Sequence, residues 1–122
     1  MQDYRKLHVW RKAHAHNLNV RNLAKRFPRT GYASLKAQIT SATESIAFNI
    51  VEGSAASSRK EFARFLDISI KSATETEYQL QLARDYSVVS LNEWESLADE
   101  TVQIRKMLCR LRAKLLEHDE QG

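Results

Sequence analysis

The chain has 122 residues, enough for one domain with a single apolar core. With one proline, three glycines and 28% charged residues, it predicts a few long helices rather than many short elements. The longest run of consecutive apolar residues is three and no signal-peptide pattern opens the chain, so we expect a cytoplasmic protein with no membrane partner. The single cysteine, Cys109, cannot form an internal disulfide and suits a reducing compartment.

Charge is distributed unevenly along the chain. Residues 1–43 contain nine Lys or Arg and one acid, a net charge of +8. Residues 44–122 contain ten Lys or Arg and fourteen acids, a net charge of −4. Either the two parts pack against each other, or the basic part leaves a positive stripe for an anionic partner.

Apolar residues at alternating spacings of three and four predict the first two helices. The first is expected over residues 7–27 and ends before Pro28, because the residue before proline avoids the α region. The second is expected over residues 35–53, with Ser34 as its N-cap and Gly53 in a left-handed conformation at its end. The two seams contain Trp10, Ala13, Asn17, Val20, Ala24 and Phe27, and then Leu35, Ile39, Ala42, Ile46 and Asn49.

The last two helices each begin with a capping box, in which Ser and Glu three residues apart bond each other's backbone N–H. The pair Ser58 and Glu61 opens a helix expected over residues 59–86, and Ser90 and Glu93 open one over residues 91–117. Four helices with three short connections predict an all-α, antiparallel up-down-up-down four-helix bundle, one domain spanning residues 1–122.

The later helices are expected to be longer than the earlier ones, so their far end should extend beyond the first pair by about 12 Å. Surplus apolar surface on a small bundle usually marks an interface, so we expect self-association there. The alternative is that residues 28–33 cover this surface. The interface is expected to contain Tyr78, Leu82, Tyr86, Val88, Val89 and Trp94.

Polar side chains interrupt the apolar seams. A buried amide or hydroxyl without a partner costs about 1–3 kcal/mol, so these groups should find partners or face an opening. Alternatively they fix the alignment of the helices, as polar seam residues do in coiled coils. They are Asn17, Asn49, Thr76, Gln79 and Thr101.

Short motifs from residue 7 to residue 90 give the chain a resemblance to a known bacterial family. They include Val9-Trp-Arg-Lys-Ala13, Phe27-Pro28, Gln38-Ile39, Ser45-Ile46, Asn49-Ile50, Glu52-Gly53, Lys60-Glu-Phe62 and Arg64-Phe-Leu66. In this order and spacing the chain resembles the four-helix bundle proteins related to those encoded by intervening sequences in large-subunit ribosomal RNA genes. The accessory variability protein of diversity-generating retroelements is a more distant likeness.

The resemblance implies a cytosolic bundle that assembles as a ring-shaped homo-oligomer, commonly a homopentamer, and binds RNA or a nucleic-acid enzyme. It attaches no catalytic activity to the chain. The chain departs from the family pattern where two arginines usually follow Gln-Ile, and around the Asn-Ile motif, which moves the search for cations to the first helix. The departures are Thr40, Ser41, Ala47, Phe48, Val51 and Ser54.

Residues for catalysis or metal binding are not spaced as those chemistries require. No acid has His three residues later, as a di-iron bundle needs, and His14 and His16 project to different sides of one helix. The chain contains neither a Gly-rich phosphate loop nor a Gly-x-Ser-x-Gly motif. We therefore expect no enzymatic activity, no metal, no cofactor and no small-molecule substrate.

Cations on the outer face of the first helix are the candidate nucleic-acid-binding residues. No aromatic residue interleaves with them, so backbone rather than base recognition is expected. A charged face that only keeps the protein soluble is one alternative, and a protein–protein interaction module without direct nucleic-acid binding is another. The candidates are Arg5, Arg11, Lys12, Arg21, Lys25, Arg26 and Arg29. The family motifs predict a second surface, facing a partner or a ring channel, of Asn49, Glu52, Gly53, Ser54, Lys60 and Phe62.

Overall fold

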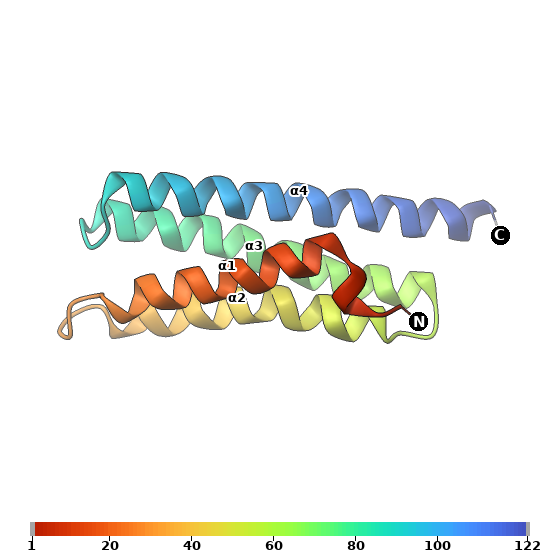
Figure 1. Ribbon diagram of the computed structural model, residues 1–122, viewed down its shortest axis with the longest axis horizontal. Coiled ribbons are helices and arrows are strands. Elements are labelled where there is room, and N and C mark those ends of the chain that lie inside the picture. Colours follow the sequence, from red (N-terminus) through yellow and green to blue (C-terminus); the bar gives the residue numbers. More distant parts are fainter. Residues whose placement is uncertain (1, 122) are drawn as a thin grey trace.

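The fold is an all-α bundle, as the sequence predicts. A computed structural model describes residues 2–121, with side chains described for residues 2–117. Within this part of the chain, consecutive helices run in alternating directions (Figure 1). None of the described helices is long and apolar enough to cross a membrane. The elements are the 3-10 helix η1 (Tyr4–Lys6), α1 (His8–Lys25), α2 (Ala33–Ser54), α3 (Arg59–Asp85) and α4 (Leu91–Gln121).

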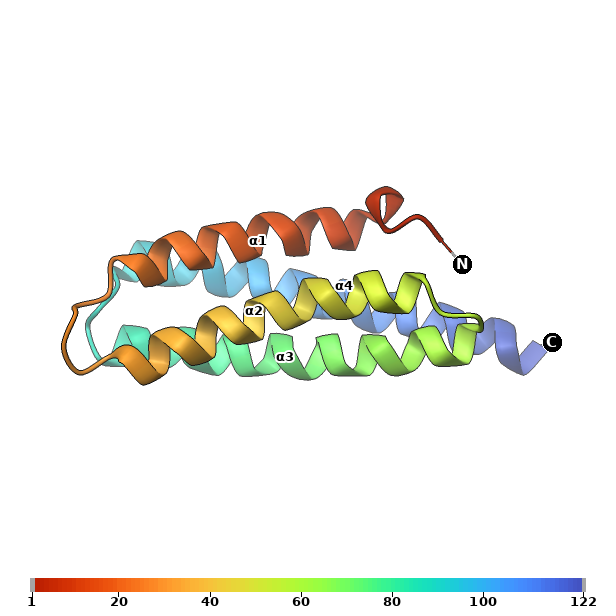
Figure 2. The ribbon, with the colours of Figure 1, turned by 90° about the horizontal axis from the view of Figure 1, so that it is seen from below.

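The expected overhang at the α3–α4 connection is not present. Figure 2 shows the α1–α2 and α3–α4 loops at about the same level at one end of the bundle, while α4 extends past the α2–α3 turn at the other. The difference arises because α1 ends at Lys25 and the loop after it extends along the bundle. In that loop, the ring of Tyr32 lies 6.0 Å from that of Tyr86. The partly buried side chains of Tyr32, Leu82, Val88, Val89 and Trp94 pack against the apolar cluster at this end.

Serine residues cap α3 and α4. The backbone N–H of Glu61 donates to Ser58 Oγ at 3.0 Å, and that of Glu93 donates to Ser90 Oγ at 3.1 Å. Ser90 N–H donates back to Glu93 Oε1 at 3.4 Å, which completes the second capping box. The expectation for Ser34 is wrong: α2 starts one residue before it, with Tyr32 at the N-cap position and no side-chain cap.

Gly53 has a different role from the one expected. It lies inside α2, which continues to Ser54, and the one glycine with positive φ among the described residues is Gly31, at 93°. A Cβ atom at Gly53 would lie 2.7 Å from Phe62 Cδ1 and 3.0 Å from Phe65 Cβ. Glycine is therefore required at this position for the close approach of α2 and α3, and not for a left-handed helix end.

The interior consists of two apolar clusters with buried polar side chains between them. One cluster, near the α2–α3 turn, includes Ile46, Ile50, Leu66, Ile104 and Leu108. The other, near the two loops, includes Val20, Leu23, Ile39, Leu80 and Leu97. Between them each helix contributes one fully buried polar residue, and we call this group the polar layer: His16, Thr43, Thr76 and Thr101.

The buried stripe of α1 contains four of the six predicted seam residues and is shifted by one residue at the other two positions. Trp10 and Asn17 are only partly buried, and His16, which the prediction left outside the seam, is fully buried. The ring of Trp10 instead packs at the helix edge, 4.9 Å from Tyr4 and stacked 5.1 Å from His14. The observed stripe is Val9, Ala13, His16, Val20, Leu23, Ala24 and Phe27.

Candidate nucleic-acid interface

The rotation of α1 divides its cations between two neighbouring helices and the solvent. Lys12 turns toward α4, where its Nζ donates to Gln103 Oε1 at 2.7 Å. Arg26 turns the same way and pairs with Glu93 of α4 at 2.6 Å. Arg21 lies on the opposite flank, 3.8 Å from Glu44 of α2. The predicted stripe is therefore not a single row of free charges.

Three of the predicted cations have neither an acidic partner nor a hydrogen bond to another α-helix among the described side chains: Arg11, Lys25 and Arg29. All three are exposed, and Arg11 donates a hydrogen bond only to the carbonyl of Arg5, at 3.2 Å. Arg5 itself lies on η1 rather than α1, 3.8 Å from Asp3 and with its guanidinium over the ring of Tyr4. These three cations can bind an anion without first breaking an ion pair or a hydrogen bond to another α-helix.

The start of α1 lies beside further cations that the sequence reasoning missed. His8 shares the lining of a hollow of about 300 Å³ with Arg110 and Lys114 of α4. Its remaining wall is apolar, formed by Leu7, Val9, Met107 and Leu111. Arg110 and Lys114 are exposed and have no acidic partner within the described part of the chain. Only the fold reveals this proximity, because about a hundred residues separate the two segments along the chain.

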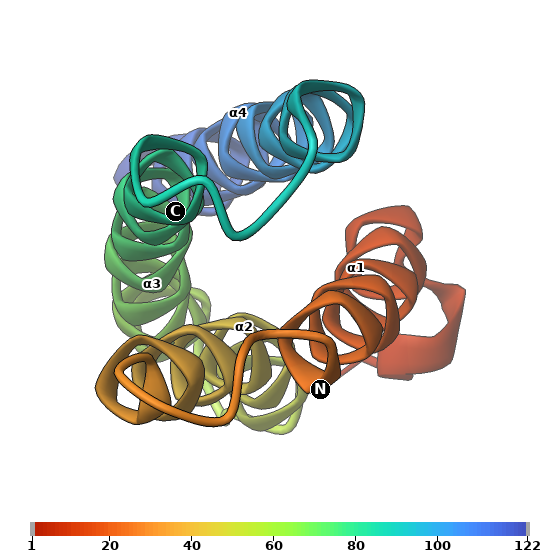
Figure 3. The same ribbon diagram turned by 90° about the vertical axis from the view of Figure 1, so that its left-hand side faces the viewer.

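We define the basic surface as Arg11, Lys25 and Arg29 together with His8, Arg110 and Lys114. It runs from Arg29, in the loop after α1, along α1 and crosses to α4 at the N-terminal end of α1. Figure 3 shows α1 and α4 facing each other on one side of the bundle, with α3 on the far side from α1. An 18-residue helix is about 27 Å long, so α1 alone can follow several phosphates of a nucleic-acid backbone.

The groove between α1 and α4 is polar and partly acidic. Asn19 lines both of its hollows, of about 450 and 490 Å³, and Glu100 lies opposite on α4. Burial raises the pKa of Glu100, although Asn19 and Lys12 oppose that rise. Asp99 also lines the groove, so the carboxylates here reduce the positive potential around Lys12 and Arg26. The basic surface is therefore strongest away from this groove.

The family-motif surface separates into buried and exposed residues. Gly53, Ser54 and Phe62 are buried, whereas Glu52 and Lys60 are exposed. Ser54 Oγ donates to the carbonyl of Val51 at 2.6 Å, so its hydroxyl is used within α2. The buried motif residues therefore shape the α2–α3 turn.

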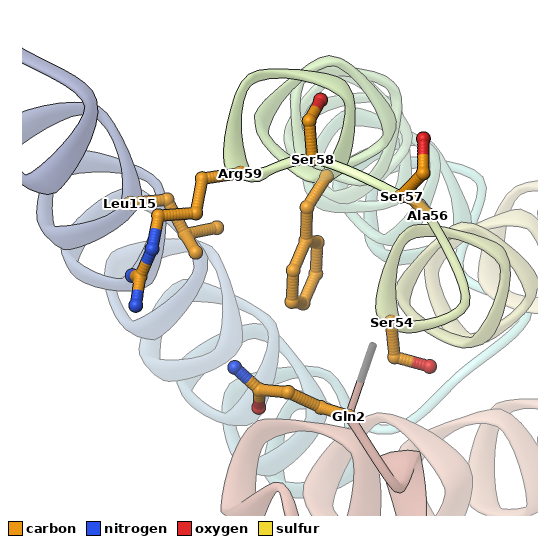
Figure 4. Close-up of a pocket in the computed structure, with 8 residues that line it drawn as sticks. Gln2, Ser54, Ala56, Ser57, Ser58, Arg59 and Leu115 are labelled. Atoms are coloured by element: carbon orange, nitrogen blue, oxygen red, sulfur yellow. The ribbon is translucent and has the colours of Figure 1, made fainter. Parts of the chain in front are cut away.

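A hollow of about 330 Å³ lies at this turn. Figure 4 shows Ser54, Gln2 and Leu115 around it, with Ser57 and Ser58 at its edge. The backbone N–H of Gln2 donates to the carbonyl of Ser54 at 2.8 Å, which holds the N-terminal segment against the turn. The hydroxyls of Ser54, Ser57 and Ser58 all have partners within the chain, so the three serines offer no free binding group. The other polar side chains that line the hollow are those of Gln2 and Arg59.

The polar seam residues are held mainly by neighbours within the bundle. Thr43 Oγ1 lies 3.0 Å from Asn17 Oδ1, which joins α1 to α2. Asn49 donates to the carbonyl of Ser45 at 2.8 Å, inside its own helix. Gln79 is the exception, because its buried Oε1 has no hydrogen-bond partner among the described atoms.

The pKa of His16 differs from that of an ordinary histidine. Burial lowers its pKa to about 4, because a charged imidazolium would lose its hydration in the apolar interior. Its Nε2 lies 2.7 Å from Thr101 Oγ1, while Nδ1 has no partner in the described structure. At neutral pH this histidine is uncharged, so it adds nothing to the positive charge of α1.

Comparison with known proteins places the chain among the proteins that its motifs suggested. The family model described as "23S rRNA-intervening sequence protein" matches residues 5–110. Among solved structures, a protein of unknown function from the S23 ribosomal protein family of Bacteroides thetaiotaomicron superposes with a TM-score of 0.80 at 29% sequence identity. The match covers 85% of this chain and 97% of that one. No protein of curated function matches.

Proposed function

Because the chain belongs to the 23S rRNA-intervening sequence protein family, we propose that it is a non-enzymatic, cytoplasmic binding scaffold whose ligand is RNA or another polyanion. The observation that carries this proposal is the basic surface. Its cations Arg11, Lys25 and Arg29, and Arg110 and Lys114 on α4, are exposed and lack acidic partners in the described structure, whereas Arg21 and Arg26 are paired. Free cations along one helix can replace the counterions of a phosphate backbone.

The contact would be with backbone and shape rather than with bases. The outward side of α1 offers no free Phe, Tyr or Trp ring for stacking within the described structure, because Trp10 is already packed between Tyr4 and His14. Affinity should therefore depend strongly on salt and weakly on RNA sequence. We also propose that the protein is a homo-oligomer, with a pentamer favoured, since several copies would multiply the basic surface and raise avidity.

Charge reversal at matched positions tests the proposal. We expect Arg11→Glu with Lys25→Glu, and separately Arg110→Glu with Lys114→Glu, to weaken binding of a labelled RNA hairpin in fluorescence anisotropy. For every phosphate that the variant no longer neutralises, the slope of log K against log salt should become shallower by about 0.9. Arg64→Glu with Lys71→Glu changes the net charge equally on exposed residues of α3 and should have a much smaller effect.

Two results would overturn the RNA proposal. One is a wild-type protein that does not bind the hairpin at moderate salt, which would favour a protein–protein interaction module instead. The other is an equal loss of affinity in the α3 control, which would mean that net charge, and not the basic surface, governs binding. Thermal unfolding followed by circular dichroism checks that every variant remains folded.

A further inference from the structure

We propose that the outer groove between α2 and α3 is the surface through which one copy of the chain packs against another. The inference rests on the homo-oligomer of the proposed function and names the surface that forms it. None of the residues that the sequence predicted for this role lines the groove, although Tyr78 directly precedes the lining residue Gln79 on α3. It is also separate from the basic surface, because α1 and α4 contribute none of its lining.

The groove is a hollow of about 730 Å³ with mostly small side chains on the α2 side and longer ones on the α3 side. At its centre Ser72 Oγ of α3 donates to Ser45 Oγ of α2 at 2.8 Å, which joins the two walls. Small side chains keep the floor low enough for another element to approach closely. The lining residues are Ala37, Gln38, Ser41, Ala42, Ser45, Ile68, Ser72, Glu75 and Gln79.

Charge is almost absent from the lining of the groove. Charged residues make up 28% of the chain, yet Glu75 is the one charged residue among the nine that line the groove. Depletion of charge is the compositional mark of the centre of a protein–protein interface. It also argues against a polyanion as the occupant, since the groove has no cation in its lining to offer a phosphate.

Apolar side chains project from the same face. Ile68 is part of the groove wall and is 46% exposed. Phe48, 61% exposed, follows Ser45 by three residues along α2 and so continues the groove-facing line toward the α2–α3 turn. A face that has both projecting side chains and a hollow can pack against the same face of a second copy.

The side chain of Gln79 is a separate indication that another molecule packs into the groove. Its side chain is 6% exposed, it forms part of the groove wall, and its Oε1 lacks a hydrogen-bond partner in the described structure. An unpaired buried acceptor costs about 1–3 kcal/mol. The terminal torsion of glutamine is soft, so a donor brought into the groove by a second copy could pair with the amide after a small rotation.

The position of α2 and α3 in the bundle keeps the groove apart from the basic surface (Figure 3). The α2–α3 side lies across the bundle from the side where α1 and α4 face each other. Assembly through α2 and α3 therefore leaves Arg11, Lys25 and Arg110 free to meet an anionic ligand. In such an oligomer the basic surface would lie outside the interface, and the exposed side chains of Phe48 and Ile68 would lie within it.

The mass of the protein in solution, measured by sedimentation equilibrium, tests this surface. We expect Ser41→Trp, which fills the groove without changing charge, and Phe48→Lys to raise the dissociation constant of the oligomer by roughly 30-fold or more. Leu91→Lys, at an apolar residue 69% exposed on α4, is the matched control and should leave the mass unchanged. Circular dichroism melting establishes that each variant is folded.

The proposal is overturned if the wild type is a monomer at micromolar concentration. It is equally overturned if Tyr86→Lys dissociates the oligomer while Ser41→Trp and Phe48→Lys do not, because the interface would then lie at the helix ends. Failure here is distinguishable from failure of RNA binding. Ser41→Trp leaves every residue of the basic surface in place, so as a monomer it should still bind the hairpin with single-site affinity.

Discussion

His16 Nε2 lies 2.7 Å from Thr101 Oγ1, so that α1 and α4 are joined by a hydrogen bond inside the bundle. The hydroxyl of Thr101 has the carbonyl of Leu97 at 2.6 Å as its acceptor. Nε2 must therefore carry the proton and donate to Thr101, which leaves Nδ1 as an unprotonated nitrogen without a partner among the described atoms. Protonating Nδ1 would place an unpaired positive charge in the interior.

The stability of the fold should therefore fall as the pH falls from about 6.5 toward 4. The pKa of His16 is about 4 in the folded chain, against 6.5 for an ordinary histidine, so the unfolded chain binds the proton first. The expected loss of unfolding free energy at pH 5, relative to neutral pH, is about 2 kcal/mol. Urea unfolding across this range measures it. The His16→Leu variant should lose this component, and an unchanged pH profile in that variant would contradict the assignment.

Replacing Thr101 should cost more than replacing Thr76. Thr101→Val removes the acceptor of His16 and leaves a buried N–H unpaired, so we expect a loss of about 1–3 kcal/mol in unfolding free energy. Thr76 is also fully buried, but its hydroxyl bonds only to the carbonyl of Ser72 in its own helix. Thr76→Val is therefore the matched control. Equal losses in the two variants would show that the link between α1 and α4 contributes nothing measurable.

Gly53→Ala should destabilise the fold by about 1–3 kcal/mol, because the added methyl group would overlap the ring of Phe62. Phe62 is buried, and the second close atom, Phe65 Cβ at 3.0 Å, cannot move away without the backbone of α3. In a Phe62→Leu background the same change should cost less, since the nearest ring atoms are gone. A double-mutant cycle measured by chemical denaturation gives this coupling, and additive losses would rule out the clash with Phe62 as the cause.

Releasing Arg26 should strengthen RNA binding. Glu93 pairs with it at 2.6 Å, and Arg26 is the main cause of the lowered pKa of that carboxylate. Glu93→Gln frees the cation, so the slope of log K against log salt should become steeper by up to about 0.9. Glu95→Gln, at an exposed acid that pairs with no cation in the described structure, makes the same change in net charge. If both variants gain equally, Arg26 takes no part in binding.

The sequence predicted the helices better than it predicted the directions in which they face. Capping at Ser58 and Ser90 is local chemistry, and both serines cap as expected. The rotation of α1 depends on tertiary packing, because Val9 and Trp10 are adjacent and both apolar. Packing places the smaller Val9 inside, and His16 follows it because Thr101 of α4 supplies a partner. The sequence of α1 alone cannot reveal that partner, because Thr101 belongs to α4.

The same rotation explains why the candidate site was only partly predictable. The composition of α1 identified the cations, but their availability depends on which of them face α2 and α4. Lys12 and Arg26 met partners on α4, while Arg11 did not. Arg110 and Lys114 were missed because their proximity to His8 follows from the antiparallel arrangement of the first and last helices. Whether the predicted residues at the helix ends form an interface stays a prediction.

The polar layer also bears on how the bundle fluctuates. His16, Thr43, Thr76 and Thr101 separate two apolar clusters, each of which draws on all four helices. An opening that begins at the two loops breaks contacts of one cluster and can stop at the layer without disturbing the other. Cooperative units of this kind differ in their opening free energies. Amide hydrogen exchange should therefore show two groups of amides, one in each half of the domain, with different protection from exchange.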